Sequence, residues 1–173
     1  MNTTEPLTAT VVDSPLGELT VIVSAAGVRA VTWPGDGTDR VPAVGDATPV
    51  GTGEVALAEA TRAQLDEYFA GERTEFDLPL DPVGTEFQLA AWEALRTIPF
   101  ARTVSYAEQA ERLGDRGKAR AVGAANGRNP ISIIVPCHRV VGSTGALTGF
   151  AGGMEAKRFL LDHERRVAGT TLL

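Results

Sequence analysis

The chain has 173 residues, a net charge of −6, one cysteine and two histidines. This length suits one or two small domains that each bury a core. The sequence has no apolar run of membrane length and no charged segment followed by an apolar leader, so we expect a cytoplasmic protein without a membrane partner. A single cysteine excludes an internal disulfide. One cysteine with two histidines is too small a set for a structural zinc site, so no metal or cofactor is expected.

The charge is divided unevenly along the chain. Residues 1–83 carry 14 acidic and 4 basic residues, a net charge of −10, whereas residues 84–173 carry 8 acidic and 12 basic residues, a net charge of +4. Such asymmetry indicates that only the second half meets a polyanion, although ordinary surface scatter can also give an excess of this size.

The first half opens with three β-branched segments separated by short turns. They are residues 7–12, 18–23 and 28–33, and they predict an antiparallel meander of three strands. Residues 34–53 hold three prolines, five glycines and three aspartates without periodicity, which predicts a long, mobile surface loop.

Helical periodicity follows over residues 54–70, with Gly71 as the expected end. The expected buried face is Leu57, Thr61, Leu65 and Tyr68. We predict an extended segment at residues 76–80. Residues 81–84 are the expected boundary between a domain at 1–83 and a domain at 84–173.

Two sequence signatures predict helices in the second half. Thr85-x-x-Gln88 is a capping box that opens a helix ended by Pro99. Ser105-Tyr106-Ala107-Glu108 is another, opening a short helix that Gly114 closes, and a further short helix begins at Asp115 or Arg116 and runs to about residue 126. Two short helices joined by a tight glycine-containing turn fit a helix-turn-helix, and the basic pair Lys118 and Arg120 fits a recognition helix. Many helical pairs share this pattern, so on its own it is a weak signal.

The only cysteine, Cys137, follows the apolar, β-branched run at residues 131–135. That run predicts a short buried strand, and Pro136 stops its ladder by removing a backbone donor, so the thiol would stand at the strand's end. A lone cysteine is most often a small buried hydrophobe. The adjacent His138 and Arg139 favour a nucleophile, because an inert core cysteine has no use for an imidazole and a guanidinium beside it.

The remaining chain predicts three features. Residues 142–145 form a turn, and residues 149–153 form a glycine-rich loop where a backbone can approach a ligand closely. The loop lacks the Gly-Lys-Ser/Thr ending of a phosphate loop. A last helix runs over residues 154–164, with Ala156, Phe159, Leu160 and His163 on one face, and the tail to residue 173 is expected to be frayed.

The run Pro136-Cys137-His138-Arg139-Val140 resembles the active-site motif of the O6-alkylguanine-DNA alkyltransferases, also called methylated-DNA–protein-cysteine methyltransferases. The resemblance extends from residues 84–88 to residues 163–164, whereas the first half matches only in its order of strands and helix. It implies an α+β fold: an N-terminal three-stranded antiparallel sheet plus helix of ribonuclease H-like type, and a C-terminal winged-helix or helix-turn-helix domain that carries the active site.

The resemblance also implies a reaction. An alkyl group would pass directly and irreversibly, in a single turnover, from O6-alkylguanine in duplex DNA to Cys137 after base flipping. O4-alkylthymine is the expected second substrate. The partner would be double-stranded DNA, and the protein would be a monomer that can cluster on DNA.

The catalytic roles that the resemblance implies fall on four residues. Cys137 would be the nucleophile, His138 would take its proton through a water, and Glu164 would hold the imidazole. Tyr106 would rotate the 3′ phosphate of the target and reach the base with its hydroxyl. Read without the resemblance, Glu164 is a solvated helix end beside two arginines.

The implied substrate and DNA contacts come from a larger set. Arg120 would enter the base stack, Asn129 would tie the active-site turn together, and Lys157 would lie near the pocket. Backbone carbonyls of Cys137 and Val140 would accept from the guanine amine, and the Ala151 N–H would face O6. Lys118 is expected to contact phosphate. Two positions depart from the family: Phe150 stands where many members have tyrosine, and Ala151 where some have serine. We expect both to change which bulky alkyl groups fit.

Three other functions are consistent with parts of the sequence. A non-catalytic lesion binder would lack the reactive cysteine that Cys137 supplies. A helix-turn-helix regulator that senses alkylation would carry an added zinc module, which this chain lacks. A Cys-His hydrolase usually has a distant histidine, whereas here His138 is the immediate neighbour of the thiol.

Overall fold

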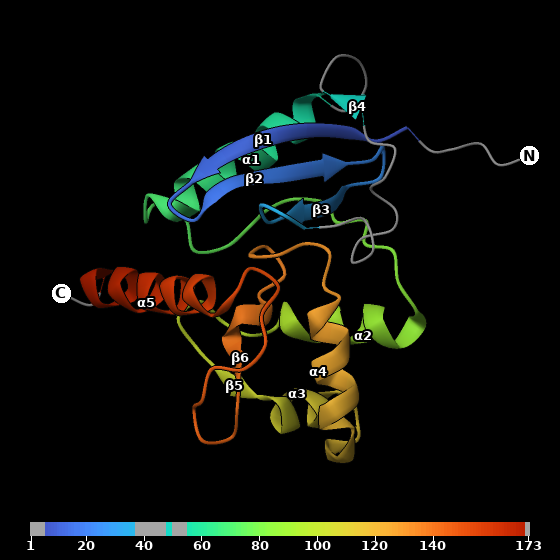
Figure 1. Ribbon diagram of the computed structural model, residues 1–173, viewed down its shortest axis with the longest axis vertical. Helices are drawn as coiled ribbons and strands as arrows, with labels where there is room; N and C mark the ends of the chain where they lie inside the picture. The colour runs from blue at the N-terminus through green and yellow to red at the C-terminus, as the bar shows by residue number, and fades with distance from the viewer. Residues whose placement is uncertain (1–5, 37–47, 50–54, 172–173) are drawn as a thin grey trace, which may run out of the picture. The chain divides into compact units, whose positions relative to one another are not determined.

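The computed structural model describes residues 6–36, 48–49 and 55–171 of the chain (Figure 1). The chain forms two compact units, Met1–Val83 and Gly84–Leu173. Each unit has its own sheet and its own helices.

The first unit is built on the antiparallel meander that the sequence predicts. Its strands are β1 (Thr8–Ser14), β2 (Gly17–Val23) and β3 (Val28–Thr32). β1 pairs with β2 along its whole length, with Ser14 opposite Gly17 across the hairpin, and β2 pairs with β3.

A fourth strand corrects the expectation of an uninterrupted loop over residues 34–53. β4 (Thr48–Pro49) runs parallel to β1 and gives the sheet the order β3-β2-β1-β4. Two residues are too few for a detectable alternation, and proline is tolerated here because β4 lies at the sheet edge. The predicted loop otherwise falls mostly on residues 37–47 and 50–53, which lie outside the described residues.

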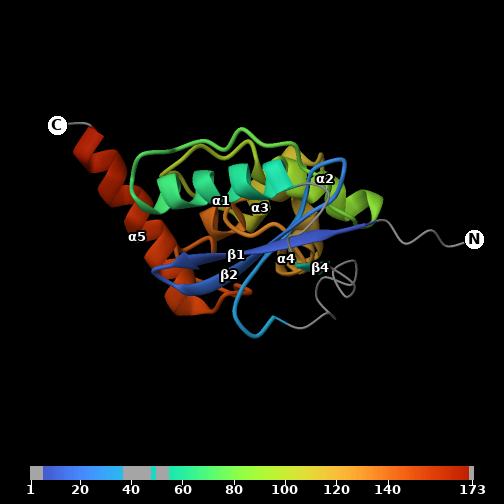
Figure 2. The ribbon, with the colours of Figure 1, turned by 90° about the horizontal axis from the view of Figure 1, so that it is seen from above.

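The helix α1 (Val55–Phe69) packs against the antiparallel strands, and Figures 1 and 2 show it along one face of the sheet. Its buried residues are Ala58, Thr61, Leu65 and Tyr68. Three of these match the predicted face, whereas Leu57 is only partly buried. Gly71 ends the helix as predicted, with a φ of +79° that glycine adopts without strain.

The extended segment after α1 returns to β3. The Val28 N–H donates to the Pro79 carbonyl and the Asp81 N–H donates to the Val28 carbonyl, both at 2.8 Å. Arg29, 7% exposed, donates to the Asp81 carboxylate at 2.7 Å and to its carbonyl at 2.9 Å. Burial alone would raise the pKa of Asp81, but hydrogen bonds from Ser24 and Arg29 outweigh it and lower the pKa. The segment is thus fixed within the first unit up to Asp81.

The second unit begins with the predicted capping box. Thr85 caps α2 (Glu86–Leu95): its hydroxyl accepts from the Gln88 N–H, and the Gln88 side chain accepts from the Thr85 N–H. Trp92, 3% exposed, lies in the core and donates from its indole to the Ala125 carbonyl at 2.8 Å. This bond satisfies the polar end of the ring while its body packs between helices.

The helix-turn-helix consists of α3 (Tyr106–Arg112) and α4 (Ala119–Gly127). Ser105 caps α3 by accepting from the Glu108 N–H, and Gly114 takes a φ of +95° in the turn. The second helix starts at Arg116 as predicted, but its first turn is the 3-10 helix η2 (Arg116–Lys118).

A buried pair of amides joins these two helices. The Gln109 amide donates to the Asn126 side chain at 3.0 Å and to the Ala91 carbonyl at 3.1 Å, and the Asn126 amide donates back to Gln109 at 2.7 Å. The pair therefore ties α3 to both α4 and α2.

The predicted strand before Cys137 is wrong. Residues 131–135 form a compact turn, in which Ile133 has a φ of +74° and the Val135 N–H donates to the Ile131 carbonyl. All five side chains are buried. The β-branched residues of this run are therefore explained by burial and not by a strand. The turn forms because the Asn129 side chain hydrogen-bonds to the backbone in place of a neighbouring strand.

Cys137 begins the 3-10 helix η3 (Cys137–Arg139) instead of ending a strand. The chain continues into β6 (Val140–Val141), which pairs in parallel with β5 (Val104–Ser105). Gly142–Gly145 form the predicted turn, and residues 149–153 lead as a loop into the last helix.

The last helix, α5, spans Met154–Thr171 and is longer than predicted. Residues 165–171, expected to be frayed, continue the helix, whereas residues 172–173 lie outside the described residues. Of the predicted face, Ala156, Leu160 and His163 are buried and Phe159 is half-buried. Lys157 and Glu164 are also buried, which sequence periodicity could not indicate for charged side chains.

Candidate active site

The thiol of Cys137 is held at the start of η3 by a braced turn. Its residue is 7% exposed, and its N–H donates to the Val135 carbonyl at 2.9 Å. The Asn129 amide donates to the same carbonyl at 2.8 Å, and its oxygen accepts from the Ile131 N–H at 3.0 Å. Asn129 thus closes the turn from both sides and fixes the backbone that presents the sulfur.

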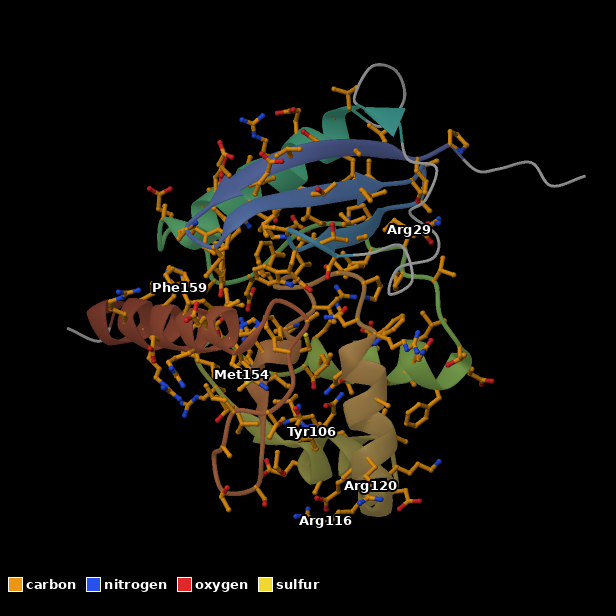
Figure 3. All side chains as sticks on the ribbon, viewed as in Figure 1. Arg29, Tyr106, Arg116, Arg120, Met154 and Phe159 are labelled. Atoms are coloured by element: carbon orange, nitrogen blue, oxygen red, sulfur yellow. The ribbon has the colours of Figure 1, made fainter. Side chains whose placement is uncertain are left out.

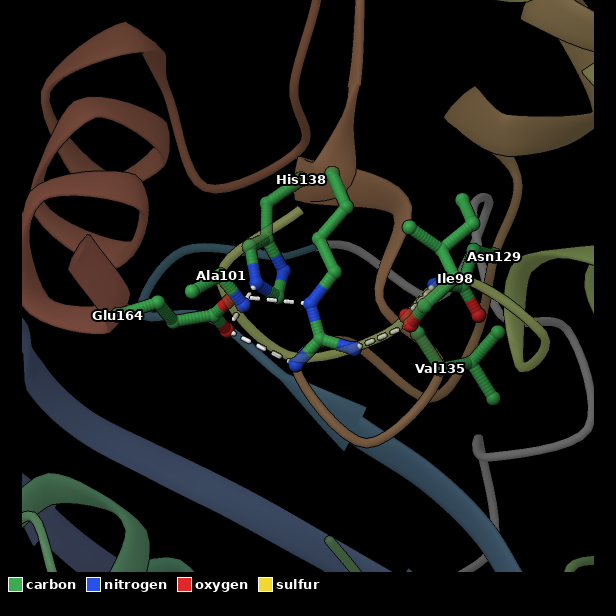
Figure 4. A network of polar contacts seen from close by, with 7 residues as sticks. Ile98, Ala101, Asn129, Val135, His138 and Glu164 are labelled. Carbon is green, nitrogen blue, oxygen red and sulfur yellow. Dashed lines mark hydrogen bonds and ion pairs between the residues drawn. The ribbon is translucent and has the colours of Figure 1, made fainter. Parts of the chain in front are cut away.

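The two residues after Cys137 belong to a buried ionic network, which Figure 4 shows. The imidazole Nε2 of His138 lies 2.7 Å from Glu164 Oε2. Arg139 donates two hydrogen bonds to the same carboxylate, from Nε to Oε1 at 2.8 Å and from Nη2 to Oε2 at 3.0 Å. The Ala101 N–H donates to Oε1 at 3.1 Å. Ala101 has a φ of +63°, a left-handed conformation that costs a residue other than glycine about 1–2 kcal/mol of conformational energy. Glu164 therefore accepts hydrogen bonds from His138, Ala101 and, twice, from Arg139.

This network sets the protonation of the pair. Burial alone would raise the pKa of Glu164, but the charges and hydrogen bonds of His138 and Arg139 hold it below its ordinary value of 4.5. Burial lowers the pKa of His138 below its ordinary 6.5, against the pull of Glu164 and with help from the charges of Arg139 and Lys157. The carboxylate is thus ionised and the imidazole neutral at neutral pH.

The position of the imidazole proton follows from its partner. An ionised carboxylate only accepts hydrogen bonds, so we assign the single N–H of the neutral ring to Nε2. Nδ1, buried and without a hydrogen-bond partner among the described residues, then carries the lone pair. His138 is therefore oriented as a proton acceptor at Nδ1.

A buried lysine supplies positive charge to the same region. Lys157 on α5 is 0% exposed and donates to the Val140 carbonyl at 2.7 Å and to the Thr148 carbonyl at 2.8 Å. Burial lowers its pKa, whereas attraction to Cys137 acts to raise it. Because that attraction is mutual, the ammonium favours the thiolate form of Cys137.

Tyr106 joins this group from the helix-turn-helix. It is the first residue of α3 and is half-buried, and its ring centroid lies 6.0 Å from Lys157 Nζ. Its hydroxyl accepts a hydrogen bond from the Thr148 hydroxyl at 2.9 Å.

The predicted DNA-contacting residues lie on the surface of the helix-turn-helix. Arg120 on α4 and Lys118 at the end of η2 are exposed, and Figure 3 shows Arg120 and Arg116 at the same end of the helical pair. The ammonium of Lys118 lies 5.7 Å from the Phe87 ring centroid. Arg120 and Lys118 are thus both open to solvent.

The remaining predicted substrate contacts lie around the loop before α5. Phe150 and Ala151 are half-buried in that loop, and Val140 is buried in β6. The Val140 carbonyl, expected to accept from the guanine amine, already accepts from Lys157, so a base would use its second lone pair.

Sequence reasoning missed the roles of Arg139 and Thr148. Arg139 also donates to the Ile98 carbonyl at 2.8 Å and lies 5.6 Å from the Phe100 ring centroid. Its position directly after His138 was the available signal. No local signal marks Thr148, because its partners lie 42 and 9 positions away along the chain.

Residues 6–36, 48–49 and 55–171 contain no cluster of three or more His, Cys, Asp or Glu side chains placed to hold a metal ion. Across the same described residues, no helix combines the length and apolarity that crossing a membrane requires.

Family models match nearly the whole chain. Residues 7–82 match the ribonuclease-like domain of 6-O-methylguanine DNA methyltransferase, and residues 86–166 match the DNA binding domain of the same family. These matches confirm the α+β class expected from the sequence: a sheet-and-helix first half and a helical DNA-binding second half.

Individual relatives agree with the family models. A methylated-DNA–protein-cysteine methyltransferase of Mycolicibacterium paratuberculosis is 58% identical over 63% of this chain and 66% of its own length. One of Methanosarcina barkeri is 42% identical over 89% of this chain and 94% of its own length. A Mycobacterium tuberculosis protein crystallised in complex with DNA superposes with a TM-score of 0.80 at 44% identity, covering 93% of both chains. The chain therefore belongs to the O6-methylguanine DNA methyltransferase family, the methylated-DNA–protein-cysteine methyltransferases.

Proposed function

We propose that this protein repairs alkylated DNA by taking the alkyl group of O6-alkylguanine onto Cys137. The observation that carries the proposal is the buried His138–Glu164 pair, with Nε2 held at 2.7 Å from the carboxylate and Nδ1 left as the proton acceptor. An inert core cysteine would not need such a base beside it.

The chemistry follows from the charges around the thiol. His138 takes the Cys137 proton at Nδ1, directly or through a water, and the Lys157 ammonium stabilises the thiolate. The sulfur attacks the alkyl carbon, and the bond from that carbon to O6 breaks with its electron pair going to guanine. Tyr106 is the proposed donor of the proton that the leaving guanine needs.

The substrate must leave the duplex for this step. O6 of guanine lies inside the base stack, and Cys137 is only 7% exposed, so the nucleotide must rotate out at a cost of roughly a few kcal/mol. Arg120, exposed on α4, is the proposed side chain that fills the vacated space. The DNA complex of the M. tuberculosis relative supports DNA as the partner.

The bond that forms makes the reaction irreversible. S-alkylcysteine is a thioether, which has no electrophilic carbonyl for water to attack. One alkyl group is therefore accepted per chain, with no cofactor.

Intact-mass analysis tests the proposal. Incubation with a duplex that contains O6-methylguanine should add one methyl group per chain, located at Cys137, and Cys137→Ala should gain none while still binding DNA. A parallel duplex with O4-methylthymine tests the second substrate. A lesion binder would bind DNA without mass gain, and steady multiple turnover at one molar equivalent would contradict the mechanism.

A further inference from the structure

Thr148 connects two parts of the site that sequence reasoning treated separately. It lies in the loop between β6 and α5, which also carries Phe150 and Ala151. Its hydroxyl donates to the Tyr106 hydroxyl at 2.9 Å, and its carbonyl accepts from Lys157 Nζ at 2.8 Å. One exposed residue thus attaches the loop both to the first residue of the helix-turn-helix and to the buried ammonium.

The direction of the first bond has a chemical consequence. A hydroxyl that accepts a hydrogen bond through its oxygen keeps its own proton for another acceptor. With Thr148 as the donor, the Tyr106 proton is left available to another acceptor.

We propose that Thr148 is a positioning residue for alkyl transfer, which fixes Tyr106 as the proton donor and stabilises its oxygen as the proton leaves. The proposal rests on the proposed function. As the S–C bond forms and the C–O6 bond breaks, the electron pair passes to guanine, and the Tyr106 proton moves to that base. The phenolate that remains accepts the Thr148 hydrogen bond. The imidazolium of His138 and this phenolate afterwards return to neutral by proton exchange with solvent.

The exposed position of Thr148 allows a clean test. Thr148→Val keeps the shape and removes the hydroxyl, Thr148→Ser keeps the hydroxyl, and Thr144→Val makes the same change at an exposed residue of the preceding turn. Single-turnover transfer from O6-benzylguanine is measured at saturating concentration. A second substrate carries an electron-withdrawing group at C8, so that its guanine leaves more readily and needs less proton donation.

We expect Thr148→Val to lower the maximal transfer rate about tenfold, as the loss of one hydrogen bond to a developing charge does. The half-saturating concentration should stay unchanged, Thr148→Ser should stay within about twofold of the parent, and Thr144→Val should match the parent. The loss in Thr148→Val should shrink with the better leaving group.

Two outcomes would overturn the role of Thr148. One is a Thr148→Val protein as fast as the parent. The other is equal slowing of the Val and Ser variants on both substrates, which would show that the residue only shapes the loop. Alkylation of the parent in the same reactions reports on the proposed function itself, so a normal parent with an unaffected Val variant overturns the inference about Thr148 alone.

Discussion

At the scale of single residues, Glu164 is held by hydrogen bonds to both of its carboxylate oxygens. Its two oxygens accept from His138, Ala101 and, twice, from Arg139, and it is 0% exposed. A buried carboxylate with every acceptor position occupied is stable only while its cationic partner remains. Arg139 is the permanent cation of this group.

Arg139→Met should therefore destabilise the protein by about 3–5 kcal/mol, because it leaves a buried charge without its main partner. Urea unfolding gives the free energy. Arg165→Met is the matched control, since Arg165 pairs with Asp162 at 3.4 Å on the surface and should lose less than about 1 kcal/mol. A similar loss of unfolding free energy in both variants would show that the buried Arg139–Glu164 pair contributes no more to stability than a surface pair.

The buried pair of His138 and Glu164 predicts that the protein loses stability in acid. The pKa of His138 is lowered in the folded state, so below its ordinary value of 6.5 the unfolded chain binds the proton first. The lowered pKa of Glu164 acts in the same direction below its ordinary 4.5. The free energy of unfolding should thus fall as the pH drops through these two ranges, as urea titrations at several pH values would measure.

A glutamine variant isolates the carboxyl contribution to this dependence. Glu164→Gln should flatten the acid limb below its ordinary value of 4.5, whereas Glu155→Gln, an exposed change on the same helix, should leave the curve unaltered. If the free energy of unfolding of Glu164→Gln falls with pH as steeply as that of the parent, a group other than Glu164 causes the loss of stability in acid.

At the scale of elements, the hydrogen bonds between Gln109 and Asn126 fix the packing of α3 against α4. Gln109→Leu should cost about 1–3 kcal/mol, because it leaves the buried Asn126 amide and the Ala91 carbonyl without their partner. Adding Asn126→Leu should recover part of the loss, since two apolar side chains no longer leave a polar group unpaired. Urea unfolding of both single variants and the double variant gives the coupling energy, and simple additivity would contradict the pairing.

The elements also show where sequence reasoning succeeds. The Thr85 capping box and the β-branched meander are local patterns, so residues a few positions apart suffice to predict them. The turn before Cys137 depends on Asn129 bonding six residues ahead, which overrides the strand preference of the intervening residues. The sequence therefore identifies Cys137 as the candidate reactive residue, but it does not predict the backbone conformation that carries the thiol.

The site follows the same division. The motif and family resemblance pointed to Cys137, His138 and Glu164; the structure brings His138 and Glu164 into contact, with Cys137 directly before His138 in η3. The contacts of Arg139 and Thr148 join segments far apart in the chain, so no spacing rule could have predicted them.

At the scale of the whole molecule, the charge divides with the two units. The first unit carries 4 basic residues against 14 acidic ones, and the second 12 against 8. If DNA binds the second unit, each lost phosphate contact should lower the slope of log affinity against log salt by about 0.9. Lys118→Ala should show this change, and Arg62→Ala, exposed on α1, should not. Equal slopes for both variants in fluorescence anisotropy would locate the contact elsewhere.

The burial of the two tryptophans has an optical consequence. Trp33 is 5% exposed in the first unit and Trp92 is 3% exposed in the second, and the chain contains no others. Each unit thus holds its own intrinsic fluorophore shielded from water, whose emission shifts to longer wavelength once water reaches the indole. With phenylalanine in place of one tryptophan, the emission of the other reports on a single unit inside the intact chain, so the melting of each half can be followed without a label.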